Sequence, residues 1–140
     1  MIIVPFSASH IGALNVQPAQ EKMRPYFSLE YAEALSKTDA FTGFINGRIV
    51  GCAGFIPQWE GRAVCWALVA RTVTKRDWVE IDRAVRRAIE MRHEHRLEAT
   101  CDTDFPGGHT WLRHLGFVRE GTLKAYTPDG RDNDLYARVK

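Results

Sequence analysis

A long amphipathic helix between two short apolar segments constrains the fold of this chain more than any other feature. Through residues 74–94 charged side chains occupy one face, while apolar residues recur at helical spacing on the other, at Trp78, Ile81, Val85, Ala88 and Ile89. Thr74 and Asp77 have the spacing of a reciprocal helix cap. The apolar segments at residues 63–69 and 97–101 are predicted to be buried strands. A strand, a helix and a second strand in this order predict a parallel crossover.

Short-range signals predict the elements of the remaining chain. Asn46-Gly47 between residues 41–45 and 48–56 is typical of a hairpin with a type I′ turn. Other strands are expected at residues 2–6, 117–126 and 135–139, and helices at residues 7–14, 28–37 and 109–115. Residues 17–25 are expected to form a loop, and Pro106-Gly107-Gly108 to break the chain before the short helix that Gly116 ends. This order predicts a mixed α/β (α+β) architecture in one domain, residues 1–140.

Composition narrows the classes of protein. The 140 residues carry 19 basic and 17 acidic side chains, a net charge of +2, too small an excess to favour a nucleic-acid partner. No segment has the length and apolarity of a membrane span or a secretory leader, so we expect no membrane partner and a cytoplasmic location. The three cysteines form no CxxC pair, and Cys101 is expected to be a core residue, so no metal site is predicted.

The segments at residues 46–54 and 111–121 carry two motifs, and both resemble motifs of the GNAT superfamily of N-acetyltransferases. Residues 46–54, Asn-Gly-Arg-Ile-Val-Gly-Cys-Ala-Gly, are similar to the hairpin between the second and third strands of that family. Residues 111–121, Trp-Leu-Arg-His-Leu-Gly-Phe-Val-Arg-Glu-Gly, are similar to its short helix with a Leu-Gly-Phe exit into a strand. The order of elements is also that of the GNAT fold. A narrower resemblance, to small GNAT-like proteins of tailed phages, would place the chain in a host cytoplasm or a virion.

The resemblance implies a mixed, mostly antiparallel central sheet of about seven strands, with the parallel crossover at its centre and flanking helices. It also implies an acetyl-CoA site where the strands at residues 63–69 and 97–101 diverge. Unpaired backbone groups of the first strand would bind the pantetheine amides, and the start of the long helix would bind the pyrophosphate. The residues implied in cofactor binding are Leu68, Val69, Ala70, Thr74, Lys75, Arg76 and His109. The glycines of the family's phosphate loop are absent, because residues 74–79 read Thr-Lys-Arg-Asp-Trp-Val.

Acyl transfer to an amine needs a base for the ammonium and a proton for the departing thiolate. Asp102 and Glu60 are the candidate bases, and Tyr126 is a candidate proton donor because the family's tyrosine position holds Leu112. Two structural interpretations, without a catalytic role, compete with these assignments. Asp102 and Asp104 are typical of turn residues that bond local N–H groups, and Tyr126 and Tyr136 are typical of packed strand aromatics.

Two functions are compatible with these patterns. The first is an acyl-CoA-dependent N-acetyltransferase that acts on a primary amine of a small molecule or protein, as a monomer or homodimer. The second is a catalytically inactive GNAT-fold phage protein that serves as a binding or virion component, which the missing glycines and Leu112 favour.

Overall fold

The strand–helix–strand unit at the centre of the sequence forms as predicted. In the computed structural model, which describes residues 1–140, it consists of β4 (Arg62–Val69), α3 (Lys75–Glu90) and β5 (Arg96–Asp102). The backbone N–H of Asp77 donates to Thr74 Oγ1 and that of Thr74 to Asp77 Oδ2, each over 3.1 Å, so the predicted reciprocal cap is confirmed. The parallel register of β4 and β5 pairs Arg62–Val64 with Arg96–Glu98.

The sheet has seven strands in the order β1-β2-β3-β4-β5-β7-β6. The other strands are β1 (Ile2–Pro5), β2 (Asp39–Ile45), β3 (Arg48–Trp59), β6 (Val118–Leu123) and β7 (Asn133–Val139). The pairs β1–β2, β2–β3, β5–β7 and β6–β7 are antiparallel. The predicted fold class, a mostly antiparallel sheet of seven strands with one parallel crossover and flanking helices, is therefore confirmed.

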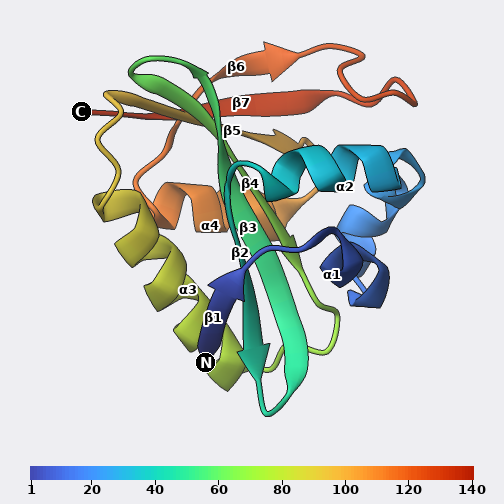
Figure 1. The fold of residues 1–140 in the computed structure, drawn as a ribbon. Helices are drawn as coiled ribbons and strands as arrows, with labels where there is room; N and C mark the ends of the chain where they lie inside the picture. Colours follow the sequence, from blue (N-terminus) through green and yellow to red (C-terminus); the bar gives the residue numbers. More distant parts are fainter. The chain divides into compact units, whose positions relative to one another are not determined.

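The chain folds into two compact units, and the first comprises Met1–Ile56 and Trp66–Arg92. It holds α1 (Ala8–Ala13), the 3-10 helix η1 (Pro18–Tyr26), α2 (Leu29–Ser36) and α3. In Figure 1, α3 lies on one side of strands β1–β3, and α1 and α2 lie on the other. A core cluster that includes Phe6, Leu14, Cys52 and Leu68 lies beneath α1 and α2. Asn46 and Gly47 both have positive φ, as the predicted type I′ turn requires.

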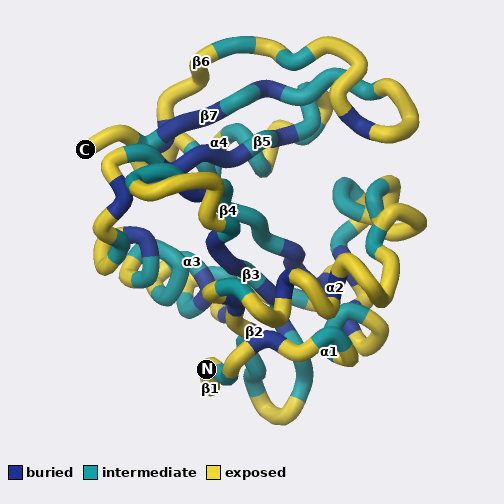
Figure 2. The backbone as a smooth tube through the Cα atoms, turned by 45° about the horizontal axis from the view of Figure 1, so that its top comes forward, coloured by how far each residue is buried: buried dark blue, intermediate teal, exposed yellow.

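The second unit comprises Pro57–Cys65 and His93–Lys140. It contains β5, β6, β7 and α4 (Pro106–His114), which packs along β5. Figure 2 shows that β5 and β7 are largely buried, whereas β6 at the sheet edge is mostly exposed. Gly116 has a φ of 91°, the left-handed conformation expected of the residue that ends α4.

The main differences from the predictions lie at the boundaries of helices and strands. Residues 17–25 are not a loop, because Pro18 begins η1, and Pro106 likewise begins α4 instead of breaking the chain. In both cases proline occupies the first turn of a helix, where its missing N–H has no helical partner to lose. The long helix ends at Glu90, four residues early, and the strand predicted for residues 117–126 ends at Leu123.

None of the helices combines the length and apolarity that crossing a membrane requires.

Candidate functional site

Beyond its pairing with β5, the edge of β4 is hydrogen-bonded by a side chain. Successive residues of a strand point their backbone groups to opposite edges, and the N–H of Ala70 donates to Val50 O of β3. Ala67 and Val69 therefore present their groups to the other edge. There the amide of Gln20 donates through Nε2 to Ala67 O over 2.7 Å and accepts through Oε1 from the N–H of Val69 over 2.9 Å. The expectation that this edge carries unpaired backbone groups is therefore wrong for Ala67 O and Val69 N–H, because both bond the Gln20 side chain.

Gln20 owes its position to the segment that precedes it. The N–H of Gln17 donates to Val69 O over 2.8 Å, and the side-chain Nε2 of Gln17 donates to Gln20 Oε1 over 3.0 Å. An antiparallel bridge between Val16 and Ala70 aligns this segment with the end of β4. The start of η1 therefore takes the place of a neighbouring strand at the edge of β4.

The three predicted cofactor residues at the end of β4 have buried side chains. Leu68, Val69 and Ala70 are between 5% and 8% exposed. Only their backbone groups can meet a ligand, which is the mode of contact that the resemblance implies.

The N-terminus of α3 carries its own anion. The side chains of Thr74, Lys75 and Arg76 are exposed there, whereas Asp77 is buried. Its Oδ2 accepts a hydrogen bond from the Arg48 guanidinium over 2.6 Å. The hydrogen bonds from Arg48 and from the backbone of Thr74 lower the pKa of Asp77. The carboxylate therefore occupies part of the cap at which the resemblance puts a pyrophosphate, and Arg48 offsets its charge.

In the second unit His109 lies on α4 with both ring nitrogens bonded. Nε2 lies 3.2 Å from the carbonyl of Thr103, which can only accept, so Nε2 donates. Nδ1 lies 2.8 Å from the hydroxyl of Tyr136, which donates to it in that tautomer. Nearby on β7, Asp134 has its pKa lowered by Arg119 and then by Thr122. This polar cluster holds α4 on β7.

The predicted base Asp102 is bonded at both oxygens. Its Oδ1 accepts from the N–H of Asp104 over 3.0 Å, and its Oδ2 pairs with Arg131. The competing interpretation of Asp102 as a turn residue therefore has direct support. Asp102 would have to release Arg131 before it accepts a proton from a substrate.

The other candidates of the second unit differ in exposure. Glu60 lies exposed in the turn between β3 and β4, and Tyr126 is 53% exposed beyond the end of β6. The prediction of a packed strand aromatic is therefore wrong for Tyr126, whereas Tyr136, 1% exposed on β7, confirms it. Cys101 is buried, as predicted, and burial raises its pKa to about 11.

Hydrogen bonds connect three of the predicted site residues through their neighbours, namely His109, Asp102 and Tyr126. His109 bonds the residue that follows Asp102, and Arg131 links Asp102 to the turn of Tyr126, because the N–H of Tyr126 donates to Arg131 O. No such link connects Glu60 to this cluster. Three residues that hold β4 and the cap of α3 were not predicted from the sequence: Gln17, Gln20 and Arg48.

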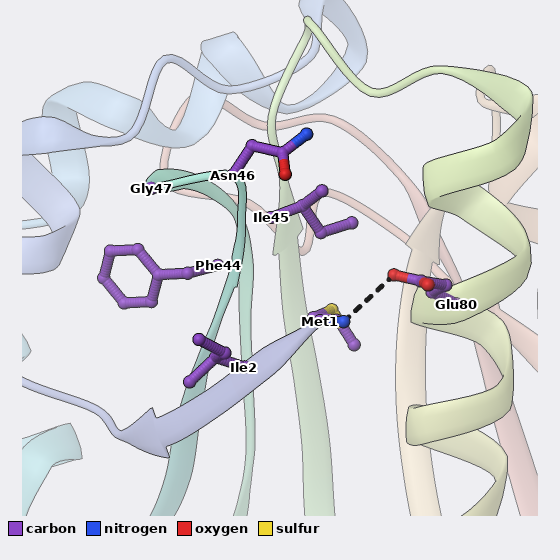
Figure 3. A pocket seen from close by; sticks show the side chains of 7 residues that line it. All are labelled: Met1, Ile2, Phe44, Ile45, Asn46, Gly47 and Glu80. Carbon is purple, nitrogen blue, oxygen red and sulfur yellow. Dashed lines mark ion pairs between the residues drawn. The ribbon is translucent and has the colours of Figure 1, made fainter.

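An open pocket of about 490 Å³ lies elsewhere in the first unit, between the β2–β3 turn and α3. None of the predicted site residues lines it. Figure 3 shows the Met1 ammonium facing the carboxylate of Glu80, and the two groups lie 3.2 Å apart. Because these two charges neutralise each other, the pocket offers a ligand little beyond the apolar side chains of Ile2, Phe44 and Ile45.

No protein-family model and no curated protein matches the sequence. Solved structures do match the fold. Ard1 from Thermoplasma volcanium aligns over 99% of this chain and 96% of its own, with a TM-score of 0.80 and 17% identity. A GNAT-family acetyltransferase from Bacillus anthracis aligns over 98% and 93%, with a TM-score of 0.70 and 16% identity. Ribosomal-protein-S5-alanine acetyltransferase from Vibrio fischeri aligns over 98% and 91%, with a TM-score of 0.68 and 18% identity.

These likenesses show that the chain has the GNAT fold, the fold of known acetyltransferases. At identities of 16–18%, these three structures establish the fold alone.

Proposed function

We propose that the protein is an N-acyltransferase of the GNAT type, with an acyl-CoA as donor and a primary amine of a small molecule or protein as acceptor. The observation that carries this proposal is the edge of β4. The parallel register with β5 covers Arg62–Val64, and beyond it the backbone of Ala67 and Val69 bonds a carboxamide. An edge that binds one amide in this way suits the amides of a pantetheine arm.

The residues at the start of α3 fit a pyrophosphate through their side chains. Lys75 and Arg76 are exposed cations in the first turn of α3. The only carboxylate of that turn, Asp77, pairs with Arg48. Charge-assisted hydrogen bonds from both side chains would hold phosphate oxygens. Thr74 lies beside them but already accepts from Asp77.

A bound acyl-CoA supplies an activated thioester. For the transfer the chain must accept a proton from the incoming ammonium, a role that we assign to Asp102 or Glu60. Glu60 is exposed, whereas Asp102 first has to leave Arg131. The exposed phenol of Tyr126 is the candidate proton donor for the leaving sulfur.

Calorimetric titration with acetyl-CoA tests the proposal, together with an assay of free thiol release over a panel of primary amines. The Lys75→Glu/Arg76→Glu variant should lose binding by at least tenfold, since two charge-assisted bonds become repulsive. Arg83→Glu/Arg87→Glu is the matched control, because it makes the same change in net charge on the exposed face of α3. Equal losses in the two variants, or the absence of any binding by the unaltered protein, would contradict the proposal.

One observation favours a second function, that of a non-catalytic binding or virion component. Both places at which a donor would bind already hold groups of the chain, Gln20 on β4 and Asp77 on α3. This function predicts no thiol release with any amine and no acetyl-CoA binding, even when Gln20 is truncated.

A further inference from the structure

The primary carboxamide of Gln20 presents to β4 the N–H donor and the C=O acceptor that one residue of an added strand would present. One N–H donates to Ala67 O over 2.7 Å, and the carbonyl oxygen accepts from the N–H of Val69 over 2.9 Å. Ala67 and Val69 are two residues apart on the same edge, which is the spacing at which an extended chain bonds a strand. In an extended ligand with two successive amides, the N–H of one and the C=O of the next can form the same two bonds only where Gln20 does not.

The segment that carries Gln20 is weakly anchored. No residue of η1 is buried, so little apolar surface holds it in place. Its polar contacts to the rest of the unit are at the surface or to backbone, including Arg71 with Glu21 over 2.9 Å and Arg24 with Leu14 O over 2.8 Å.

Leaving the strand edge costs Gln20 its two hydrogen bonds to β4 and little else. Gln20 is only half-buried, and water can satisfy its carboxamide once it moves away. The N–H of Gln17 bonds Val69 O independently of the Gln20 side chain, so a change of the Gln20 rotamer does not by itself release the whole segment.

We propose that Gln20 is an autoinhibitory group, which occupies the amide-binding edge of β4 in the free protein and must be displaced when the amide-containing arm of an acyl donor binds there. This inference rests on the proposed function for the nature of the donor. The Gln20 side chain then sets the affinity of the site, because every ligand amide competes with an amide that is already attached to the chain.

Truncation of the side chain tests the inference. Gln20→Ala should bind pantetheine and acetyl-CoA roughly 10-fold to 30-fold more tightly, the factor that corresponds to two ordinary hydrogen bonds no longer broken on binding. Glu21→Ala is the matched control, since it loosens the same segment by removing the Arg71 ion pair but leaves Ala67 and Val69 bonded to Gln20. The control should bind both ligands as the unaltered protein does. Gln20→Glu removes the donor to Ala67 O but still accepts from the N–H of Val69, so it should gain less affinity than Gln20→Ala.

Nuclear magnetic resonance gives a readout that does not depend on a variant. The side-chain NH₂ signals of Gln20 should be protected from hydrogen exchange in the free protein and become fast-exchanging when pantetheine saturates it. If these signals stay protected at saturation, or if truncation of Gln20 leaves the affinity for pantetheine unchanged, the inference is overturned.

The two proposals fail in different ways. Tighter pantetheine binding by Gln20→Ala without any acyl transfer supports the autoinhibitory role and removes the enzymatic function. Acyl transfer with an unchanged pantetheine affinity supports the enzyme and removes the autoinhibitory role. If neither pantetheine nor acetyl-CoA binds any variant, both proposals are wrong.

Discussion

Replacement of Glu98 by glutamine should destabilise the parallel pair on which the proposed site depends. In that pair Arg62 of β4 and Arg96 of β5 are direct register partners, so two guanidinium groups with like charge face each other. Glu98 compensates both. It accepts from Arg62 Nε and Nη2 over 2.6 and 2.8 Å, and from Arg96 Nε over 2.6 Å. Glutamine keeps the shape of this side chain and removes its charge.

The magnitude follows from the pKa of Glu98, which hydrogen bonds from Arg62 and then from Arg96 lower from 4.5 to about 2 although burial opposes them. That difference corresponds to roughly 3 kcal/mol of stabilisation at neutral pH, at about 1.4 kcal/mol per pH unit. The carboxylate is 9% exposed, but water reaches the two guanidiniums, which are 24% and 27% exposed. Screening reduces the expected loss in Glu98→Gln to about 1–2 kcal/mol.

Urea unfolding followed by circular dichroism measures this loss, and its pH dependence identifies the cause. Because the folded pKa lies below the unfolded one, the contribution of Glu98 is complete above pH 4.5 and disappears as the pH falls toward about 2. The stabilities of the unaltered protein and of Glu98→Gln should therefore converge over that interval. Glu120→Gln, which removes only the outer partner of Arg96, should lose less. A constant difference between the two proteins from neutral pH to pH 2 would refute the electrostatic account.

Three further predictions concern single sites. Tyr136→Phe removes the donor to His109 Nδ1 and should cost about 1 kcal/mol in urea unfolding, with a shift of the His109 ring signals in the NMR spectrum. Gly116→Ala puts a side chain at a φ of 91° and should lower the free energy of unfolding by about 1–2 kcal/mol, whereas no change would contradict the observed exit from α4. Cys101, whose pKa burial raises to about 11, should resist iodoacetamide at neutral pH and react only after unfolding, as mass spectrometry of the alkylated peptides can establish.

Sequence reasoning predicted the elements whose signals are local. The cap of Thr74 with Asp77, the turn at Asn46-Gly47 and the left-handed Gly116 each depend on a few adjacent residues, and all three are confirmed. The errors lie where a local signal has two meanings. Proline within residues 17–25 and at Pro106 was interpreted as a break, but at the first turn of a helix it is a favourable residue.

The partners of the candidate site are non-local, which is why the sequence did not reveal them. Gln20 lies 47 residues before Ala67, and Arg48 lies 29 residues before Asp77. A glutamine in a polar segment has no periodicity or spacing that distinguishes it from a solvated side chain. Asp102 shows the opposite case, since the turn chemistry expected of an aspartate after a strand is what the structure contains.

The two halves of the proposed donor site should respond differently to salt. Asp77 already takes part of the cap of α3, so a phosphate would be held chiefly by the exposed side chains of Lys75 and Arg76. Contacts of exposed charges weaken as the Debye length falls from about 30 Å at 0.01 M to about 3 Å at 1 M ionic strength. The amide bonds to Ala67 and Val69 involve no net charge. In Gln20→Ala, CoA should therefore bind several-fold more weakly at high ionic strength, while pantetheine affinity stays constant, as paired calorimetric titrations can measure. Equal salt dependence for both ligands would mean that Lys75 and Arg76 do not contact the phosphates.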